Sequence, residues 1–155
     1  MNTEELRLAY EGILTDAAAA TYGPPPAGEW DAELIVAHLV ANDNLLVAAM
    51  GEVLAGHSPT YDNHAACDVD GLSRIVAAAR GFAALVEQLR STSSQVVELA
   101  AKLDDGHAAT MIPTRIVDGG TVQVDQPLPL AAILRAQTAL HLPSHRAQLA
   151  TLASS

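Results

Sequence analysis

The chain has 155 residues, of which 50% are hydrophobic, and its formal net charge is −10 from 18 acidic and 8 basic residues. This length favours a single domain over residues 1–155 with a substantial core. Because no cluster of Lys or Arg could follow a phosphate backbone, the charge argues against nucleic-acid binding and against adhesion to an anionic membrane.

The composition and the single cysteine indicate a helical protein of a reducing compartment. Aromatic residues make up only 3% of the chain, so the core must consist of Ala, Leu, Val and Ile, and the abundant Ala and Leu favour helix. Cys67 alone cannot form an intramolecular disulfide. The acidic start of the chain is unlike a secretory signal, and no apolar run approaches the ~20 residues of a membrane span. We therefore expect a cytoplasmic protein without a membrane segment.

The first helix is predicted over residues 3–22. Asn2 is placed to cap it, and Glu5 stands in the capping-box position three residues later. Apolar residues then recur at helical spacing. Gly23 and the three prolines that follow it end the helix, because proline removes a backbone donor and restricts φ.

The second helix is predicted over residues 31–55, with Gly56 as its C-terminal stop. It is apolar on nearly every side. Such a helix is either central in the fold or covered by a partner subunit. This excess of apolar surface predicts a homodimer.

The third helical segment is predicted over residues 70–103. Its apolar positions recur at alternating steps of three and four without losing phase, which is typical of one long amphipathic helix. A kink, where one occurs, is expected at the serine-rich residues 91–94.

The pattern then changes before the last helix. Residues 110–117 and 121–125 are rich in Thr, Val and Ile, and Asp118-Gly119-Gly120 lies between them, which predicts a small β-hairpin or extended excursion. A last helix is predicted over residues 130–152. The expected fold class is therefore all-α, a four-helix bundle with this small excursion before its last helix.

Two histidines in the last helix stand out chemically. His141 and His145 are four residues apart, so their imidazoles project from the same helical face and can bind one metal ion. His38, in the middle of the second helix, is the candidate third ligand; the alternative is a core histidine satisfied by one hydrogen bond. Three imidazoles suit Zn²⁺, Ni²⁺ or Fe²⁺ with positions open for water or substrate.

At this point the chain resembles the DinB-like (YfiT-like) family of four-helix-bundle metal proteins. The segment from Glu29 to Leu39 is similar to the family's second helix, with Trp30 followed by His38-Leu39. The segment from His141 to Leu149 is similar to the family's final His-x-x-x-His-x-x-Gln-Leu. The resemblance covers most of the chain and implies that His38, His141 and His145 are the metal ligands and that Trp30 is a packing residue.

Four residues near these histidines in the sequence bear on the geometry of the predicted site. Gln148, one turn beyond His145, is either a support for a ligand or an ordinary polar residue. Asn42 is on the correct face to approach the metal, whereas Asp43 is expected to point elsewhere. Pro143 departs from the family pattern and predicts either a kink or a helix start between the two ligands, which would change the angle between their imidazoles.

The remaining candidates are expected outside the site. His57, His64 and His107 are predicted to be solvated, although His64 with Asp62 could reach the mouth of the site. Cys67 is expected to be a small buried hydrophobe rather than a nucleophile.

The resemblance implies a thiol-dependent S-transferase related to the mycothiol-dependent maleylpyruvate isomerases. The metal would activate the sulfur of a low-molecular-weight thiol, such as mycothiol, for attack on a small-molecule electrophile. Two alternatives remain at this stage. One is a hydrolase whose metal activates water, and the other is a non-catalytic, dimeric bundle that binds metal or a small ligand.

Overall fold

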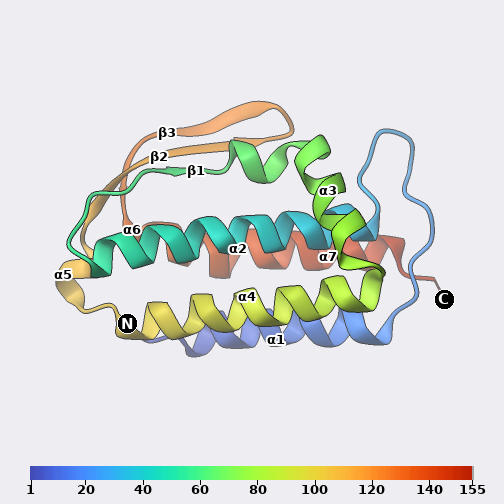
Figure 1. The fold of residues 1–155 in the computed structure, drawn as a ribbon, viewed down its shortest axis with the longest axis horizontal. Helices are drawn as coiled ribbons and strands as arrows, with labels where there is room; N and C mark the ends of the chain where they lie inside the picture. The colour runs from blue at the N-terminus through green and yellow to red at the C-terminus, as the bar shows by residue number, and fades with distance from the viewer. Residues whose placement is uncertain (155) are drawn as a thin grey trace.

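The computed structural model describes residues 1–154, which form a mostly helical fold with a small three-stranded sheet along one side (Figure 1). The chain order is α1 (Glu4–Ala19), α2 (Ala32–Leu54), β1 (Tyr61–Asp62), the 3₁₀ helix η1 (His64–Cys67), α3 (Val69–Ala79), α4 (Phe82–Lys102), α5 (Asp105–Ala108), β2 (Met111–Asp118), β3 (Thr121–Pro129), α6 (Leu130–Ala136), the π-helical turn η2 (Gln137–His141) and α7 (Leu142–Leu152).

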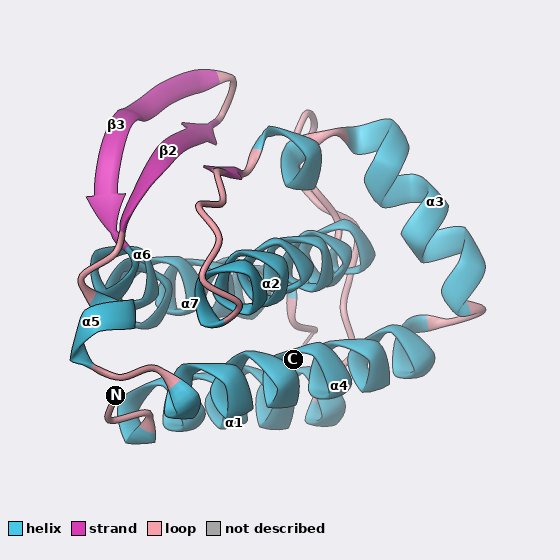
Figure 2. Ribbon diagram, turned by 60° about the vertical axis from the view of Figure 1, so that its left-hand side comes forward, coloured by secondary structure: helices cyan, strands magenta, loops and turns pink. Residues whose placement is uncertain are grey.

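Helix α2 is the centre of the fold. It packs against α4, α3 and α7, while α1 packs against α4 and α7 (Figure 2). Ile35, Leu39, Leu46 and Met50 of α2 are fully buried. Most of its apolar surface is therefore covered within the chain, which removes the sequence argument for a partner subunit there, and the homodimer stays a prediction.

The expectation that no apolar run approaches the length of a membrane span was wrong for α2. Within residues 1–154, α2 is a helix long and apolar enough to cross a membrane by length and composition, with a mean hydropathy of 1.5 over its most apolar window. That window is 61% buried against the rest of the chain, and the helix also buries His38, Asn42 and Asp43. A central helix of a folded core has these properties because it meets neighbours on several sides.

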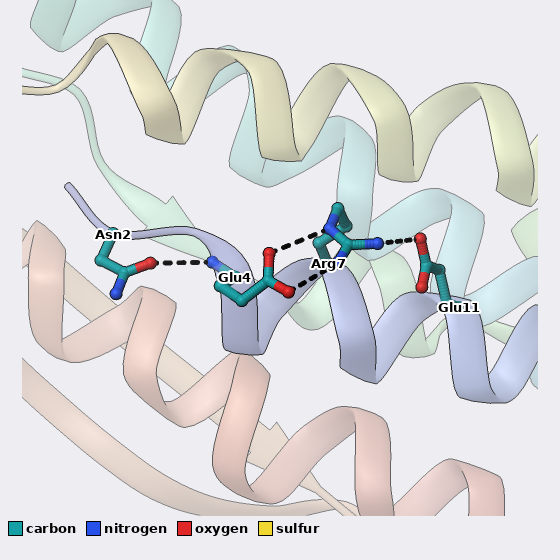
Figure 3. Close-up of polar contacts among 4 residues, drawn as sticks. All are labelled: Asn2, Glu4, Arg7 and Glu11. Carbon is teal, nitrogen blue, oxygen red and sulfur yellow. Dashed lines mark hydrogen bonds and ion pairs between the residues drawn. The ribbon is translucent and has the colours of Figure 1, made fainter.

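The start of α1 differs from the predicted capping box. Thr3 occupies the cap position without a side-chain hydrogen bond, and the Asn2 side chain instead accepts from the Glu4 backbone N–H at 3.0 Å. Glu5 makes no reciprocal bond in the described chain. Figure 3 shows the exposed Arg7 between Glu4 and Glu11, an arrangement of surface ion pairs that adds little to stability.

The predicted third helix is two helices. α3 ends at Ala79, Arg80 adopts the left-handed conformation with φ of 59°, and α4 begins after Gly81, whose φ is 125°. The serine-rich stretch lies within the regular helix α4, where the Thr92 and Ser93 hydroxyls donate to carbonyl groups one turn earlier. An unbroken apolar periodicity could not reveal the break, since both helices keep their apolar residues toward the same core.

Gly81 should be the glycine least tolerant of substitution. Its φ of 125° and ψ of 157° define a region that only glycine adopts readily, although no heavy atom lies within 4 Å of an added Cβ. We expect Gly81→Ala to lower the free energy of unfolding by about 1–3 kcal/mol, measured by urea denaturation. Gly51→Ala, in the helical interior of α2 with equally open space, should raise it by about 0.5–1 kcal/mol. Equal effects at the two positions would contradict this conformational argument.

The predicted hairpin is confirmed as β2 and β3. The two strands are antiparallel, and Gly119 and Gly120 form the turn with positive φ values of 54° and 78°. A third strand was not predicted: β1 pairs in parallel with β2, bringing Tyr61 opposite Thr114. The strand was missed because its two residues are too short for a periodic signal.

The last helical run has the predicted bounds, and an irregularity lies within it. The η2 turn is π-helical, with the Leu142 N–H donating to the Gln137 carbonyl five residues earlier. Pro143 follows in the first turn of α7, where its missing N–H is tolerated. The structure therefore places the irregularity expected near Pro143 just before it, in the turn that carries His141.

Candidate metal centre

Three histidines from separate helical elements converge on one point. His38 comes from α2, His141 from the π-helical turn η2, and His145 from the first turns of α7. One ligand atom from each lies within 4.8 Å of the others. The Nε2 atoms of His38 and His141 are 2.8 Å apart. His38 is only 3% exposed, and the other two rings are half-buried.

Hydrogen bonds orient two of the three rings. His38 Nδ1 lies 2.6 Å from the Ala66 carbonyl oxygen, and His145 Nδ1 lies 2.9 Å from Gln148 Oε1. Both oxygens can only accept, so each Nδ1 carries the proton and donates it. The Nε2 atoms of His38 and His145 are then unprotonated and free to bind a cation. Fixing the tautomer of a metal ligand in this way is typical of protein metal sites.

The third ring has a different environment. His141 Nδ1 is buried and has no hydrogen-bond partner within the described residues. With His38 Nε2 unprotonated, His141 Nε2 either donates to it or shares a cation with it. The donor set, three neutral imidazoles with one ligand atom of each within 4.8 Å of the others, fits a borderline divalent metal such as Zn²⁺.

All three histidines are held neutral near pH 7. Burial, followed by the charge of His145, lowers the pKa of His38 to about 4. Burial, followed by the charges of His145 and His38, lowers the pKa of His141 to about 2. Burial also lowers the pKa of His145, and the hydrogen bond that His145 donates to Gln148 opposes this shift. Neutral imidazole is the form that binds metal, so the site does not need to release protons near neutral pH.

A single asparagine places the carbonyl group that orients His38. Asn63 is 7% exposed, and its side chain donates to the Val117 carbonyl at 3.0 Å and accepts from the Val117 N–H at 2.7 Å. These two bonds attach the start of η1 to the end of β2. The attachment places Ala66 beside His38, and it brings the Asp118 carboxylate near enough to oppose the lowering of the His38 and His145 pKa values. Sequence reasoning missed Asn63 and Asp118 as neighbours of the site, because they lie in a loop and a hairpin without a motif.

Residues next to the three histidines behave partly as predicted. Gln148 contacts His145 directly and is not an ordinary surface polar residue. The Trp30 ring packs on His38 with a centroid separation of 5.3 Å. Asn42 does not approach the histidines: its side chain donates to Gln137 and accepts from Tyr61. Asp43 points elsewhere, as expected, and accepts from Tyr10 and Thr92 in the core.

The remaining histidines and the cysteine stay outside the cluster. His57 pairs with Glu52 on the surface, His107 forms a capping box with Asp104, and His64 is exposed. Cys67 is half-buried, with its Sγ 3.7 Å from the Val117 carbonyl oxygen, and burial raises the pKa of its thiol. A raised pKa disfavours the thiolate, so Cys67 is unsuited to be a nucleophile.

The described chain is a mostly helical protein with a small three-stranded sheet and three histidines that could hold a metal ion. Neither a described protein family nor a curated protein matches the chain at the level of sequence. Among solved structures, the fold is similar to that of the mycothiol-dependent maleylpyruvate isomerase, with a TM-score of 0.67 and 14% sequence identity. The match covers 94% of this chain but 57% of that protein, so the chain spans little more than half of its length.

Proposed function

We propose that this protein is a four-helix-bundle metalloenzyme of the DinB-like type in which His38, His141 and His145 bind a divalent metal, Zn²⁺, Ni²⁺ or Fe²⁺. One observation carries the proposal: the three histidines converge, and the Ala66 carbonyl and Gln148 hold two of the rings in the tautomer that leaves Nε2 unprotonated. A core histidine satisfied by one hydrogen bond accounts for a single ring, such as His38 with the Ala66 carbonyl, but not for three rings that converge on one point.

We further propose a thiol-dependent S-transferase activity. A metal bound here would lower the pKa of a coordinated thiol, as it does for coordinated water. The chain would hold the metal through three neutral ligands, so positive charge remains uncompensated at the site, while the Asp118 carboxylate nearby favours cation entry. The thiol would lose its proton to water, and its sulfur would form a bond to an electrophilic carbon. In an addition, a π bond at that carbon would break and its far atom would take up a proton; in a substitution, the bond to a leaving group would break.

The comparison supports the choice of thiol. The structurally similar protein is described as mycothiol-dependent, which makes mycothiol the first candidate for this chain. We do not propose the same substrate for this chain, because the match covers only 57% of that protein. We propose only that the electrophile is a small molecule.

The test compares metal-loaded with chelated protein. Mycothiol, glutathione or cysteine is mixed with a chromogenic aryl halide, and the rate is followed between pH 5 and 9. We expect thiol attack to be faster with loaded protein and the apparent pKa of the thiol to fall. An unchanged thiol pKa and rate in protein with stoichiometric metal would contradict the S-transferase. Ester or amide cleavage that needs the metal and no thiol would favour the hydrolase instead.

The cytoplasmic location and the homodimer remain predictions beside this proposal. Sedimentation equilibrium of the metal-loaded protein tests the homodimer. A mass of one chain across the micromolar range would contradict it, and the S-transferase proposal would stand in either case, because all three ligands come from one chain.

A further inference from the structure

A continuous set of buried polar side chains lies in the core of the helical fold. Six residues take part, none more than 8% exposed, and they come from four helical elements and one strand: Tyr10 (α1), Asn42 and Asp43 (α2), Tyr61 (β1), Thr92 (α4) and Gln137 (η2). Leaving such groups unpaired in a core is costly, so the hydrogen bonds among them constrain the elements that carry them.

The hydrogen bonds run in one direction and end at a carboxylate. Tyr61 donates its hydroxyl to Asn42 Oδ1 at 2.5 Å, and Asn42 Nδ2 donates to Gln137 Oε1 at 3.0 Å. Gln137 Nε2 donates to the Tyr10 hydroxyl oxygen at 3.0 Å, and Tyr10 donates to Asp43 Oδ1 at 2.5 Å. The path ends at an oxygen that accepts, so the terminal carboxylate sets the orientation of the amides and hydroxyls before it.

The second carboxylate oxygen of Asp43 accepts a hydrogen bond from α4. Thr92 of α4 donates to Asp43 Oδ2 at 2.9 Å, and Gln137 Nε2 also lies 3.5 Å from Asp43 Oδ1. The carboxyl of Asp43 is therefore the point at which α1, α4 and the π-helical turn are joined to α2.

Two residues of this set are close in sequence to two of the clustered histidines. Asn42 follows His38 by four residues in α2, and Gln137 precedes His141 by four residues in η2. Residues four apart lie on the same face of a helix, one turn from each other. The Asn42–Gln137 hydrogen bond therefore joins α2 to η2 one turn away from the point where His38 and His141 approach each other.

We propose that Gln137 is a positioning residue of the metal centre, which with Asn42 and the anchor Asp43 sets the approach of His38 to His141. This inference rests on the metal site proposed above and concerns the geometry of that site. His141 is the ring that needs such support, because its own Nδ1 has no partner among the described residues. The other two rings are oriented directly by Ala66 and Gln148.

The experiment measures Zn²⁺ affinity by chelator competition and the absorption spectrum of the Co²⁺-loaded protein, in samples shown by circular dichroism to be folded. Gln137→Met removes the amide at similar length. We expect a fall in Zn²⁺ affinity of about 10–100-fold, the loss typical of outer-shell partners of metal ligands, and a changed Co²⁺ spectrum. Asp43→Asn, which keeps the shape and replaces one of the two acceptor oxygens with an N–H donor, should change both readouts in the same direction.

Ser93→Ala is the matched control. Ser93 is 4% exposed in the same core, but its hydroxyl donates to the Arg90 carbonyl outside this set of bonds. Its replacement should leave Zn²⁺ affinity and the Co²⁺ spectrum unchanged, whatever its effect on stability. If folded Gln137→Met and Asp43→Asn proteins bind Zn²⁺ as the wild type does, the set of bonds serves stability alone and the inference is wrong.

Two further outcomes keep the inference separate from the proposed function. Should Gln137→Met fail to fold, Tyr61→Phe is the deciding variant, since it removes one hydroxyl from the start of the path and keeps the ring. We expect this variant to lose less Zn²⁺ affinity than Gln137→Met. An unchanged Zn²⁺ affinity would overturn the inference. A wild type that binds Zn²⁺ without thiol transfer would refute the S-transferase and leave the inference standing. A wild type that binds no divalent metal would refute both.

Discussion

Replacing His38 with alanine is expected to abolish stoichiometric metal binding. Its Nε2 lies at the centre of the cluster, 2.8 Å from His141 Nε2, and its ring is in contact with the rings of both other histidines. Two remaining imidazoles on adjacent turns cannot complete a three-ligand site. The loss of affinity should therefore exceed the ~10–100-fold typical of losing an outer-shell partner. Metal content after dialysis, measured by plasma mass spectrometry, tests this.

The matched control for this variant is His64→Ala. His64 is exposed in η1, two residues before the Ala66 carbonyl group that orients His38. Its removal should leave metal content unchanged, because its side chain takes no part in the cluster. A His38→Ala protein that retains full metal content would show that the cluster is a packed set of core histidines, and it would contradict the proposed function as well.

The second large effect is a loss of stability of the metal-free protein in acid. His38 and His141 have pKa values of about 4 and about 2 in the folded chain, against an ordinary value of 6.5. Below pH 6.5 the unfolded chain takes up a proton at each of these residues that the folded chain does not. Stability is therefore lost as the pH falls, by about 1.4 kcal/mol per pH unit for each histidine well below 6.5.

Asp43 has the opposite effect over part of this range. Its burial raises its pKa to about 7 from 3.8, against the hydrogen bonds from Tyr10 and Thr92. Between these values the folded chain holds a proton that the unfolded chain has lost, so Asp43 contributes stability as the pH falls from 7 to 3.8. One carboxyl opposes two strongly shifted histidines, so the net effect is a loss. The net loss by pH 4 is about 3 kcal/mol, a large part of a typical total stability of about 5–15 kcal/mol.

Urea denaturation of chelated protein between pH 7.5 and 4.5 measures this dependence. His141→Ala should reduce the stability lost per pH unit, since it removes one of the two histidine contributions. Asp43→Asn should increase the stability lost per pH unit, since it removes the carboxyl that opposes the histidines. Saturating Zn²⁺ should stabilise the wild type near neutral pH, by about 4 kcal/mol at a free concentration 1,000 times the Kd. A stability of the chelated wild type that is constant or rises toward pH 5 would contradict the shifted histidine pKa values.

Several features of the fold follow from short stretches of sequence. The bounds of α2, the hairpin with its two glycines and the extent of the last helical run were predicted within a few residues, because periodicity, capping and turn residues act locally. The break between α3 and α4 was not, since Arg80 is an unusual residue for a left-handed conformation and the apolar pattern continues past it. The 2-residue β1 was missed because it has no pattern of its own.

For the site, residue spacing indicated His141 and His145 as a pair, the place of His38 in the middle of the second helix made it the candidate third ligand, and the family resemblance implied all three. Neither could identify the groups that orient these rings. The contacts made by Asn42 and Tyr10 with Gln137 join residues 95 and 127 positions apart, and the Ala66 carbonyl reaches His38 only because Asn63 attaches η1 to β2. Local propensities choose helices and turns, but tautomers and ring orientations depend on partners that meet only when the core packs. The tertiary structure alone therefore decided which way the histidine lone pairs face.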